Sequence, residues 1–262
     1  MSGLDAGAIT AALERAGAAR GRPICVVERT GSTNEDARRA ALDGAPHGAM
    51  FLADAQTAGR GRGGHAWHSP PGENLYLSVV LRPRLPATAI SPITLALGVA
   101  AASVAERALG GAAEVRVKWP NDVLAGGRKL AGVLVEGQIR GDAVQALIAG
   151  VGLNVHARSF PAELEGRATS LALLGAGDLH REALAAALVL AIEEATARFE
   201  AGRLSPFEGE LARLDGLRGR RVAIGDVTGT AAGIDGEGRL LVRGDDGSVR
   251  PVVAGEVSVG GA

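Results

Sequence analysis

The sequence predicts an α+β protein with a mixed or antiparallel sheet, followed by a small all-β barrel. Helix-like and strand-like hydrophobic patterns alternate through residues 1–212. From Arg221 onward, short valine-rich segments alternate with glycine-aspartate turns. With 262 residues, 47% of them hydrophobic, the chain can bury a substantial core. We therefore divide it into residues 1–212, which begin with a short helix in 1–20, and residues 213–262.

The elements of the larger part follow from periodicity and turn residues. Ile9, Leu13 and Ala16 share one face of a helix, and the segment ICVVE is typical of a buried strand that contains Cys25. Ser32 or Thr33 can begin a helix that continues to Asp43. Consecutive strands read as hairpins, so we expect one sheet with its helices on one face. The predicted helices span 5–19, 33–43, 93–109 and 181–202, and the predicted strands span 24–28, 49–55, 74–81, 115–119, 123–124, 129–139 and 144–155.

The C-terminal part contains five short strand-like segments. They are RVAIG, GTAAGID, RLLVRG, SVRPVVAG and EVSV, and GD, DGEG and DDG turns occur among them. Regular spacing of short strands and turns is typical of a small barrel.

Charge and cysteine content exclude several classes of function. The formal net charge is −1, so the chain has no overall attraction to nucleic acid or to a membrane surface. Its single cysteine excludes an intrachain disulfide and a cysteine-based zinc site. The N-terminus lacks a signal-peptide pattern, and no uncharged apolar run reaches about 18 residues. We expect a cytoplasmic protein.

The segment QTAGRGRGGHAWHS, residues 56–69, is an unusual loop between two strands. Its glycines allow a backbone to approach a ligand closely, and Arg60 and Arg62 offer donors suited to carboxylate or phosphate. Because these arginines alternate along the chain, one can face a ligand while the other braces the loop. GRGRGG lacks the spacing of G-x-G-x-x-G and the helix that follows it in dinucleotide sites. The alternatives are a lid that orders on binding and a plain surface loop.

The segment VKWPNDVLAGGRKLAGVLVEG combines an amide, a carboxylate and a lysine. Asn121 and Asp122 lie in a turn, where the carboxylate can hold Mg²⁺ or orient an amine. Lys129 begins a strand, so its ammonium group would be held rigidly near glycines and can neutralise developing charge. The alternative is an exposed surface hairpin.

Two shorter segments also combine glycines or hydroxyls with a polar side chain. In AGVGLNVH, Gly150 and Gly152 interrupt an apolar strand, which indicates either a bulge or close approach of a ligand, and Asn154 would need hydrogen-bond partners. In TGSTNEDA, the hydroxyls either cap a helix or bind a neutral polar group.

Taken together and in this order, these motifs resemble the biotin–protein ligases. The motifs are STN at 32–34, QTAGRGRGGHAW at 56–67, KWPNDV at 118–123, RKLAGVLVE at 128–136 and GVGLNV at 150–155. The resemblance covers roughly residues 24–262. It implies a class II synthetase-like catalytic domain and an SH3-like C-terminal barrel. It also implies that ATP and biotin form biotinyl-5′-AMP, with Mg²⁺, before a lysine of the apo biotin carboxyl carrier protein of acetyl-CoA carboxylase accepts the biotin.

The resemblance also implies roles for individual residues. Lys129 and Arg62 would stabilise charge at the reacting centre, and Asp122 would hold the metal or orient the incoming lysine. The implied biotin-binding residues are Ser32, Thr33, Asn34, Gln56, Gly59, Arg60, Gly61, Arg62, Lys129, Gly132, Gly150 and Gly152. The implied ATP-binding residues are Arg62, Trp67, Asn121, Lys129 and Asn154, with Trp67 near the adenine.

Two features depart from the family pattern. Many members continue the loop with a further arginine, where this chain has Gly63, Gly64 and His65, so we expect weaker ATP affinity at high pH. Some members add a DNA-binding domain before the first strand, and about 20 residues cannot form one. We therefore expect a ligase that is not a repressor and binds no DNA and no membrane, and that can form a homodimer. The alternatives are a lipoate-type ligase and a non-catalytic biotin or nucleotide sensor.

Overall fold

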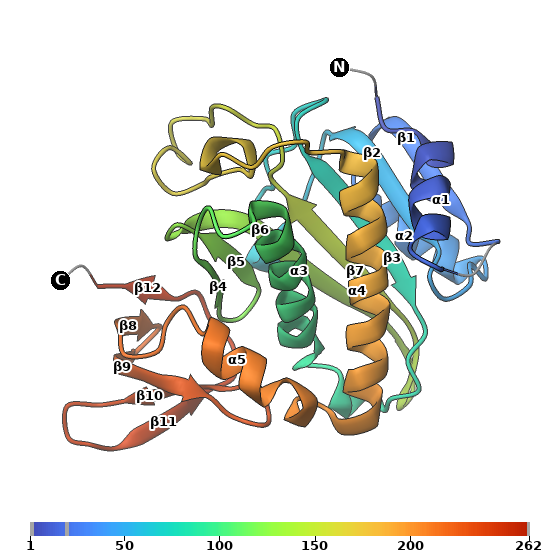
Figure 1. Cartoon of the computed structure of the whole chain (residues 1–262). Coiled ribbons are helices and arrows are strands. Elements are labelled where there is room, and N and C mark those ends of the chain that lie inside the picture. Colours follow the sequence, from blue (N-terminus) through green and yellow to red (C-terminus); the bar gives the residue numbers. More distant parts are fainter. Residues whose placement is uncertain (1–2, 19–20, 261–262) are drawn as a thin grey trace.

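The computed structural model describes residues 3–18 and 21–260, and two β-sheets dominate it (Figure 1). The larger sheet has seven strands in the order β1-β2-β3-β7-β6-β5-β4, and the smaller has five in the order β11-β10-β9-β8-β12. The strands of the larger sheet are β1 (Ile24–Thr30), β2 (Met50–Gln56), β3 (Leu75–Leu81), β4 (Val115–Lys118), β5 (Asp122–Ala125), β6 (Arg128–Arg140) and β7 (Ala143–Leu153). The helices are α1 (Ala6–Arg15), α2 (Thr33–Leu42), α3 (Ile93–Leu109), α4 (Arg181–Gly202) and α5 (Glu208–Leu214).

The predicted α+β class and mixed sheet are confirmed. Strand β1 pairs with β2 in parallel, and every other pair in the larger sheet is antiparallel. The predicted helix over 5–19 is shorter, because α1 ends at Arg15, and Ala19 lies outside the described residues.

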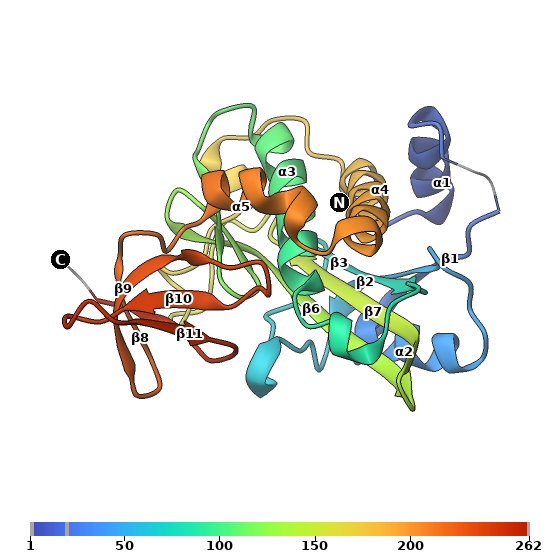
Figure 2. The same ribbon diagram turned by 90° about the horizontal axis from the view of Figure 1, so that it is seen from below.

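The expectation of helices on one face is wrong. Helices α1, α3 and α4 cover one face with the main hydrophobic core, and α2 covers the opposite face (Figure 2). In the second, smaller core, Ala37 and Ala41 of α2 pack near Val80, Ala146 and Ile148. All seven residues of β3 are buried, which requires cover on both faces.

The expectation of a buried Cys25 is also wrong. Its thiol is exposed, because β1 is an edge strand of the larger sheet. The apolar segment ICVVE predicted the strand correctly but did not reveal its place at the edge.

The smaller sheet packs against the larger unit through a continuous core. Its strands are β8 (Arg221–Ile224), β9 (Val227–Ile234), β10 (Leu240–Arg243), β11 (Val249–Val252) and β12 (Ser258–Val259). Val222 and Leu240 belong to the same core as α3 and α4, and the Trp119 indole Nε1 donates a hydrogen bond of 2.9 Å to the carbonyl of Gly238. The predicted boundary at 212/213 would fall inside α5.

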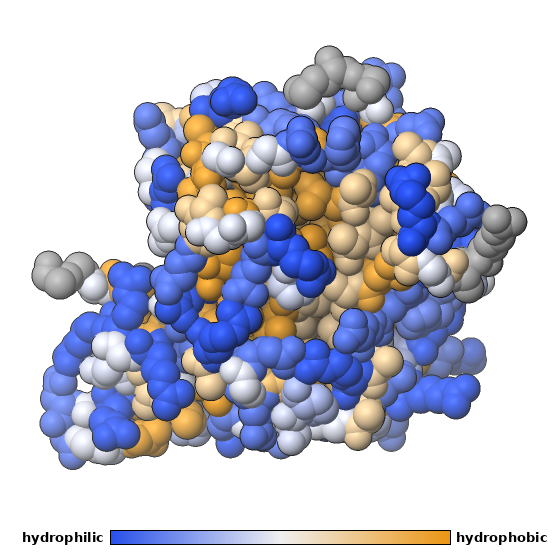
Figure 3. All heavy atoms as spheres, viewed as in Figure 1, coloured by the Kyte–Doolittle hydropathy of each residue, from blue (hydrophilic) through white to orange (hydrophobic). Residues whose placement is uncertain are grey.

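The surface adds two observations. On the face drawn in Figure 3, apolar residues gather around α3 and α4, while the region of the smaller sheet is mostly hydrophilic. None of the described helices is long and apolar enough to span a bilayer.

Candidate active site

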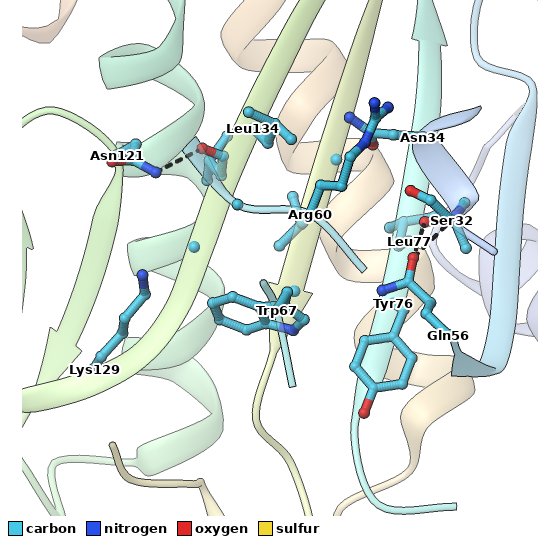
Figure 4. Close-up of a pocket in the computed structure, with 17 residues that line it drawn as sticks. Ser32, Asn34, Gln56, Arg60, Trp67, Tyr76, Leu77, Asn121, Lys129 and Leu134 are labelled. Carbon is cyan, nitrogen blue, oxygen red and sulfur yellow. Dashed lines mark hydrogen bonds between the residues drawn. The ribbon is translucent and has the colours of Figure 1, made fainter. Parts of the chain in front are cut away.

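A pocket opens over the middle of the larger sheet, where β6 and β7 lie side by side (Figure 4). Strands, the start of α2 and the loop at 56–69 all contribute to its wall. It brings together most of the residues that the sequence singled out. The predicted residues that line it are Ser32, Thr33, Asn34, Gln56, Arg60, Gly61, Trp67, Asn121, Lys129, Gly132, Gly150 and Gly152.

Three glycines make room for larger side chains over the sheet. Gly152 pairs with Gly132 across β7 and β6, and Gly150 pairs with Leu134. A Cβ at Gly150 would overlap the amide of Asn34, and a Cβ at Gly152 would overlap the indole of Trp67. The pairing of β7 with both neighbours is regular at Gly150 and Gly152, so these glycines do not mark a β-bulge. They instead allow other groups to approach the strand closely.

The start of α2 presents hydroxyls to the pocket. Ser32 is the N-cap residue, but its side chain makes no capping hydrogen bond. Gln56 caps the helix instead, since its Oε1 accepts a 2.9 Å hydrogen bond from the Thr33 backbone N–H. Gln56 Nε2 donates to Ser69 Oγ at 3.0 Å, which fastens the end of the loop at 56–69. The Ser32 hydroxyl has no hydrogen-bond partner among the described residues, so it is available to a ligand.

Asn34 lies in a buried hydrogen-bond chain. Its Oδ1 is 2.6 Å from the Ser78 hydroxyl, and its Nδ2 donates to Glu136 Oε2 at 2.7 Å. Glu136 also pairs with Arg60 at 3.2 Å. Ser78 and Glu136 were not predicted as site residues from the sequence. Ser78 is the single polar residue of β3 besides Tyr76, and Glu136 follows Gly132 and Leu134 on the same face of β6, so strand alternation could have found both.

Tyr76 also lines the pocket and was not predicted as a site residue. Its hydroxyl donates a 3.0 Å hydrogen bond to the carbonyl of Pro70, just beyond the loop. Burial raises the pKa of Tyr76 well above its usual range, so the phenol stays neutral.

Lys129 lies at the opposite end of the pocket from Ser32 (Figure 4). Its Nζ is 2.7 Å from Asp122 Oδ1 and 5.2 Å from the centroid of the Trp67 ring. The ammonium is therefore fixed by an ion pair on one side and by an aromatic face on the other. Its side chain remains 37% exposed, which leaves it accessible to an anion from solvent.

Trp67 lies inside this pocket, over Gly132 and Gly152. Its indole Nε1 is buried and has no hydrogen-bond partner among the described residues. The structure thus places the predicted adenine contact beside the predicted biotin contacts.

Four predicted residues lie outside the wall of this pocket. Arg62 points to the smaller sheet, where its Nη1 donates a 2.9 Å hydrogen bond to the carbonyl of Gly255. Arg60 faces the pocket, so the alternation predicted for the two arginines is confirmed. Asn154 is buried and its Nδ2 donates to the carbonyl of Thr169 at 2.9 Å, and Gly59 packs closely against Trp67 and Ser69.

Asp122, the fourth of them, offers the site one carboxylate for a metal. No group of three or more metal-ligating side chains occurs within residues 3–18 and 21–260. A Mg²⁺ ion here would take most of its ligands from nucleotide phosphates and water, as Mg²⁺ commonly does.

His65 lies at the tip of the loop and also faces the smaller sheet. Its Nε2 is 3.6 Å from Glu256 Oε2, and both side chains are largely exposed. Such an exposed contact contributes little to stability.

The comparisons with known proteins agree with one another. Residues 26–154 match the sequence model of the Biotin/lipoate A/B protein ligase family, and residues 219–260 match that of the Biotin protein ligase C terminal domain. A Biotin–[acetyl-CoA-carboxylase] ligase of Mycobacterium tuberculosis is 38% identical over 236 residues, 84% of this chain and 83% of the relative. A bifunctional ligase/repressor of Bacillus spizizenii is 33% identical over 235 residues, 87% of this chain and 71% of the relative.

A solved structure agrees with these sequence relatives. The biotin protein ligase of Aquifex aeolicus in complex with biotin and ATP superposes with a TM-score of 0.78 and 28% identity. The match covers 92% of this chain and 100% of that one.

Proposed function

The chain belongs to the biotin protein ligase family, and from this premise we propose that it activates biotin with ATP and transfers it to a carrier protein. In the first step, a biotin carboxylate oxygen bonds to the α-phosphorus of ATP, and pyrophosphate leaves. In the second step, a lysine amine of the apo biotin carboxyl carrier protein of acetyl-CoA carboxylase attacks the acyl carbon. AMP leaves, and the amine loses a proton.

One observation carries the substrate proposal. The pocket has neutral hydrogen-bonding groups from Ser32, Thr33 and Asn34 at one end, where Arg60 is paired with Glu136, and the ammonium of Lys129 at the other (Figure 4). Biotin has a neutral ureido head and a carboxylate tail, so this polarity fits it along its length. Gly132 and Gly152 lie beneath Trp67 and Gly150 lies beneath Asn34, so these glycines would shape the biotin site through the two side chains that they admit.

The reacting atoms would meet at Lys129. Its ammonium group can attract both the biotin carboxylate and the α-phosphate, and it stabilises the charge that develops as they join. We assign Asp122 to holding this ammonium, in keeping with their 2.7 Å ion pair. Asn121, whose Nδ2 donates to the carbonyl of Val133 at 3.1 Å, would lie beside the nucleotide.

The loop at 56–69 would protect the intermediate from water. A mixed anhydride hydrolyses readily, and a loop closed over it would exclude solvent. Arg60, which faces the pocket, would help to close the loop over the intermediate. Arg62, which contacts Gly255, would reach the phosphates only after leaving that carbonyl.

The metal, the smaller sheet and Asn154 also have proposed roles. We infer that Mg²⁺ accompanies ATP, that the smaller sheet helps to seat ATP or the carrier, and that Asn154 supports the nucleotide side of the site from the interior. A ligase without repressor activity and a homodimer stay predictions. Electrophoretic mobility shift against operator-length DNA and sedimentation velocity would test them.

A lipoate-type ligase is the second candidate, because the family model covers both kinds of enzyme. Lipoate has an apolar dithiolane head that cannot use the hydroxyls at the start of α2. A pocket that hydrogen-bonds its substrate discriminates strongly against an analogue without those groups.

The test is the first half of the reaction. The protein is incubated with ATP, Mg²⁺ and either biotin or lipoate, and acyl-AMP is measured by chromatography. We expect biotinyl-5′-AMP and little lipoyl-AMP. The opposite preference would support the lipoate-type ligase, and biotin binding without any acyl-AMP would support a sensor.

A further inference from the structure

Within the described part of the chain, Glu136 is the one carboxylate that contacts two predicted biotin-binding residues at once. It accepts a 2.7 Å hydrogen bond from Asn34 Nδ2, and its other oxygen, Oε1, is 3.2 Å from Arg60 Nη2. It lies on β6 two residues beyond Leu134, which lines the pocket, and therefore on the same face of the strand.

The contact with Glu136 determines the orientation of the Asn34 amide. The amide has one acceptor end and one donor end. Its oxygen is 2.6 Å from the hydroxyl of Ser78, which is fully buried, and its nitrogen faces Glu136. Reversing the amide would put its oxygen against the carboxylate, where two acceptors repel. Because the carboxylate can only accept, Glu136 selects one orientation of Asn34, and the Ser78 hydroxyl contacts the oxygen end in that orientation.

The chain of contacts continues to the helix start and to the loop. The Ser78 hydroxyl is also 2.8 Å from Thr33 Oγ1, which in turn is 3.2 Å from Gln56 Oε1. At the other end, Glu136 holds Arg60 of the loop. One hydrogen-bonded chain thus joins α2, β3, β6 and the loop around the end of the pocket that we assign to the ureido head.

Gly150 provides the space that this chain of hydrogen bonds needs. Ser78 and Leu134 flank Gly150 on the two neighbouring strands, and a Cβ there would overlap the Asn34 amide. The sheet thus leaves a space above Gly150 that Asn34 fills, and Glu136 and Ser78 hold the amide in that space.

We propose that Glu136 is a positioning residue for biotin, acting through Asn34 and Arg60, with Ser78 as its counterpart on the other side of the amide. This inference rests on the proposed function, since it concerns the biotin end of the same pocket. In the proposed reaction, Glu136 contacts none of the reacting atoms. Its loss would weaken biotin binding and leave the chemical step at Lys129 intact.

The test compares Glu136→Gln with wild type, using direct biotin titration by calorimetry and the rate of biotinyl-5′-AMP formation at saturating biotin. The substitution keeps the size of the side chain but removes the charge that pairs with Arg60 and that fixes the amide. We expect the biotin Kd to rise about tenfold or more, because hydrogen bonds to charged groups are among the stronger ones. We expect kcat and the KM for ATP to change less than about twofold.

Glu35→Gln is the matched control. Glu35 also lies near Arg60, at 3.8 Å, but two hydrogen bonds commit it to Arg38. Removing its charge should leave the biotin Kd unchanged. Ser78→Ala is the second variant, and it should raise the biotin Kd without any change of charge.

The outcomes separate this inference from the proposed function. If wild type binds no biotin, the proposed function fails. If wild type binds biotin and Glu136→Gln binds it equally well, or loses kcat at an unchanged Kd, only the positioning role is overturned. A double-mutant cycle with Arg60→Ala gives an independent check, since coupled residues should show non-additive effects on the biotin Kd, whereas additive effects would overturn the link to Arg60.

Discussion

Single residues decide what this pocket can hold, and Gly150 is the clearest case. Alanine at this position would displace the amide of Asn34, because its Cβ would overlap the side-chain oxygen. We expect Gly150→Ala to raise the biotin Kd at least about tenfold in calorimetric titration, since the loss of a well-placed hydrogen bond has effects of this size.

Gly177→Ala provides the control for this substitution. Gly177 is exposed and does not have a positive φ, and a Cβ added there would have no other atom within 4 Å. Equal biotin affinity in the two variants would contradict the assignment of Asn34 to the biotin site.

Lys129 is the residue on which the chemistry depends most. Lys129→Ala removes the cation between Asp122 and Trp67, so formation of biotinyl-5′-AMP should fall about 10²- to 10³-fold, as for other losses of a preorganised charge stabiliser. Biotin binding should persist, because the groups near Ser32 remain. The assay is pyrophosphate release at saturating biotin.

Arg128→Ala tests whether any nearby cation would suffice. Arg128 precedes Lys129 on β6 and does not line the pocket. Turnover near wild type in Lys129→Ala, or an equal loss in both variants, would show that the central cation is misassigned.

At the scale of elements, the loop at 56–69 is fastened at both ends and at its tip. The Gln56 side chain joins the two ends through Ser69, and Tyr76 holds Pro70 just beyond the loop. Arg62 ties the tip to Gly255, which lies between β11 and β12. Arg62→Ala should therefore speed amide hydrogen exchange within residues 59–66 about fivefold in the absence of ligands, as expected for one hydrogen bond of ordinary strength.

His65→Ala is the comparison for that experiment. The contact of His65 with Glu256 is exposed, so its loss should leave the exchange rates unchanged. Unchanged exchange in Arg62→Ala would mean that Gly255 does not restrain the loop.

His156, which follows β7, makes stability depend on pH. Partial burial lowers the pKa of His156, and the positive charges of Arg181 and Arg158 lower it further. The folded protein therefore binds this proton less readily than the unfolded chain, in which the pKa is about 6.5. This contribution to stability is complete above that value and is lost as the pH falls through the lowered pKa of the folded state.

His156→Asn should remove this dependence. We expect the free energy of unfolding, measured in urea, to fall less between pH 7 and pH 5 in the variant than in wild type. Identical losses in the two proteins would show that His156 protonates equally well in the folded and the unfolded chain.

Much of this element-level picture could be predicted from the sequence. Hydrophobic periodicity gave the order of helices and strands, and the unusual motifs gave most of the pocket wall. Alternation within GRGRGG predicted that Arg60 and Arg62 would diverge, but it could not say which partner each would find. Arg62 contacts Gly255, which lies far away along the chain, and local pattern carries no information about such a contact.

At the scale of the whole molecule, the main hydrophobic core is continuous and reaches both sheets, and a second, smaller core lies beneath α2. The helix α2 was predicted, but its place on the second face was not, because the burial of β3 and β7 on both faces depends on the complete sheet. The exposure of Cys25 was missed for the same reason, since only the strand order places β1 at the edge. Ser78 and Glu136 were not predicted because their roles depend on contacts with Asn34, which lies far from both in the sequence.

These features support a view of the chain as an enzyme in which a pocket aligns biotin between neutral donors and one lysine. The most direct measurement is transfer of biotin to an apo biotin carboxyl carrier domain, followed by mass spectrometry of the intact carrier and of its peptides. We predict that wild type adds one biotin to one lysine, only when ATP and Mg²⁺ are present, and that Lys129→Ala does not. An unmodified carrier after incubation with wild type, ATP, Mg²⁺ and biotin would contradict this account.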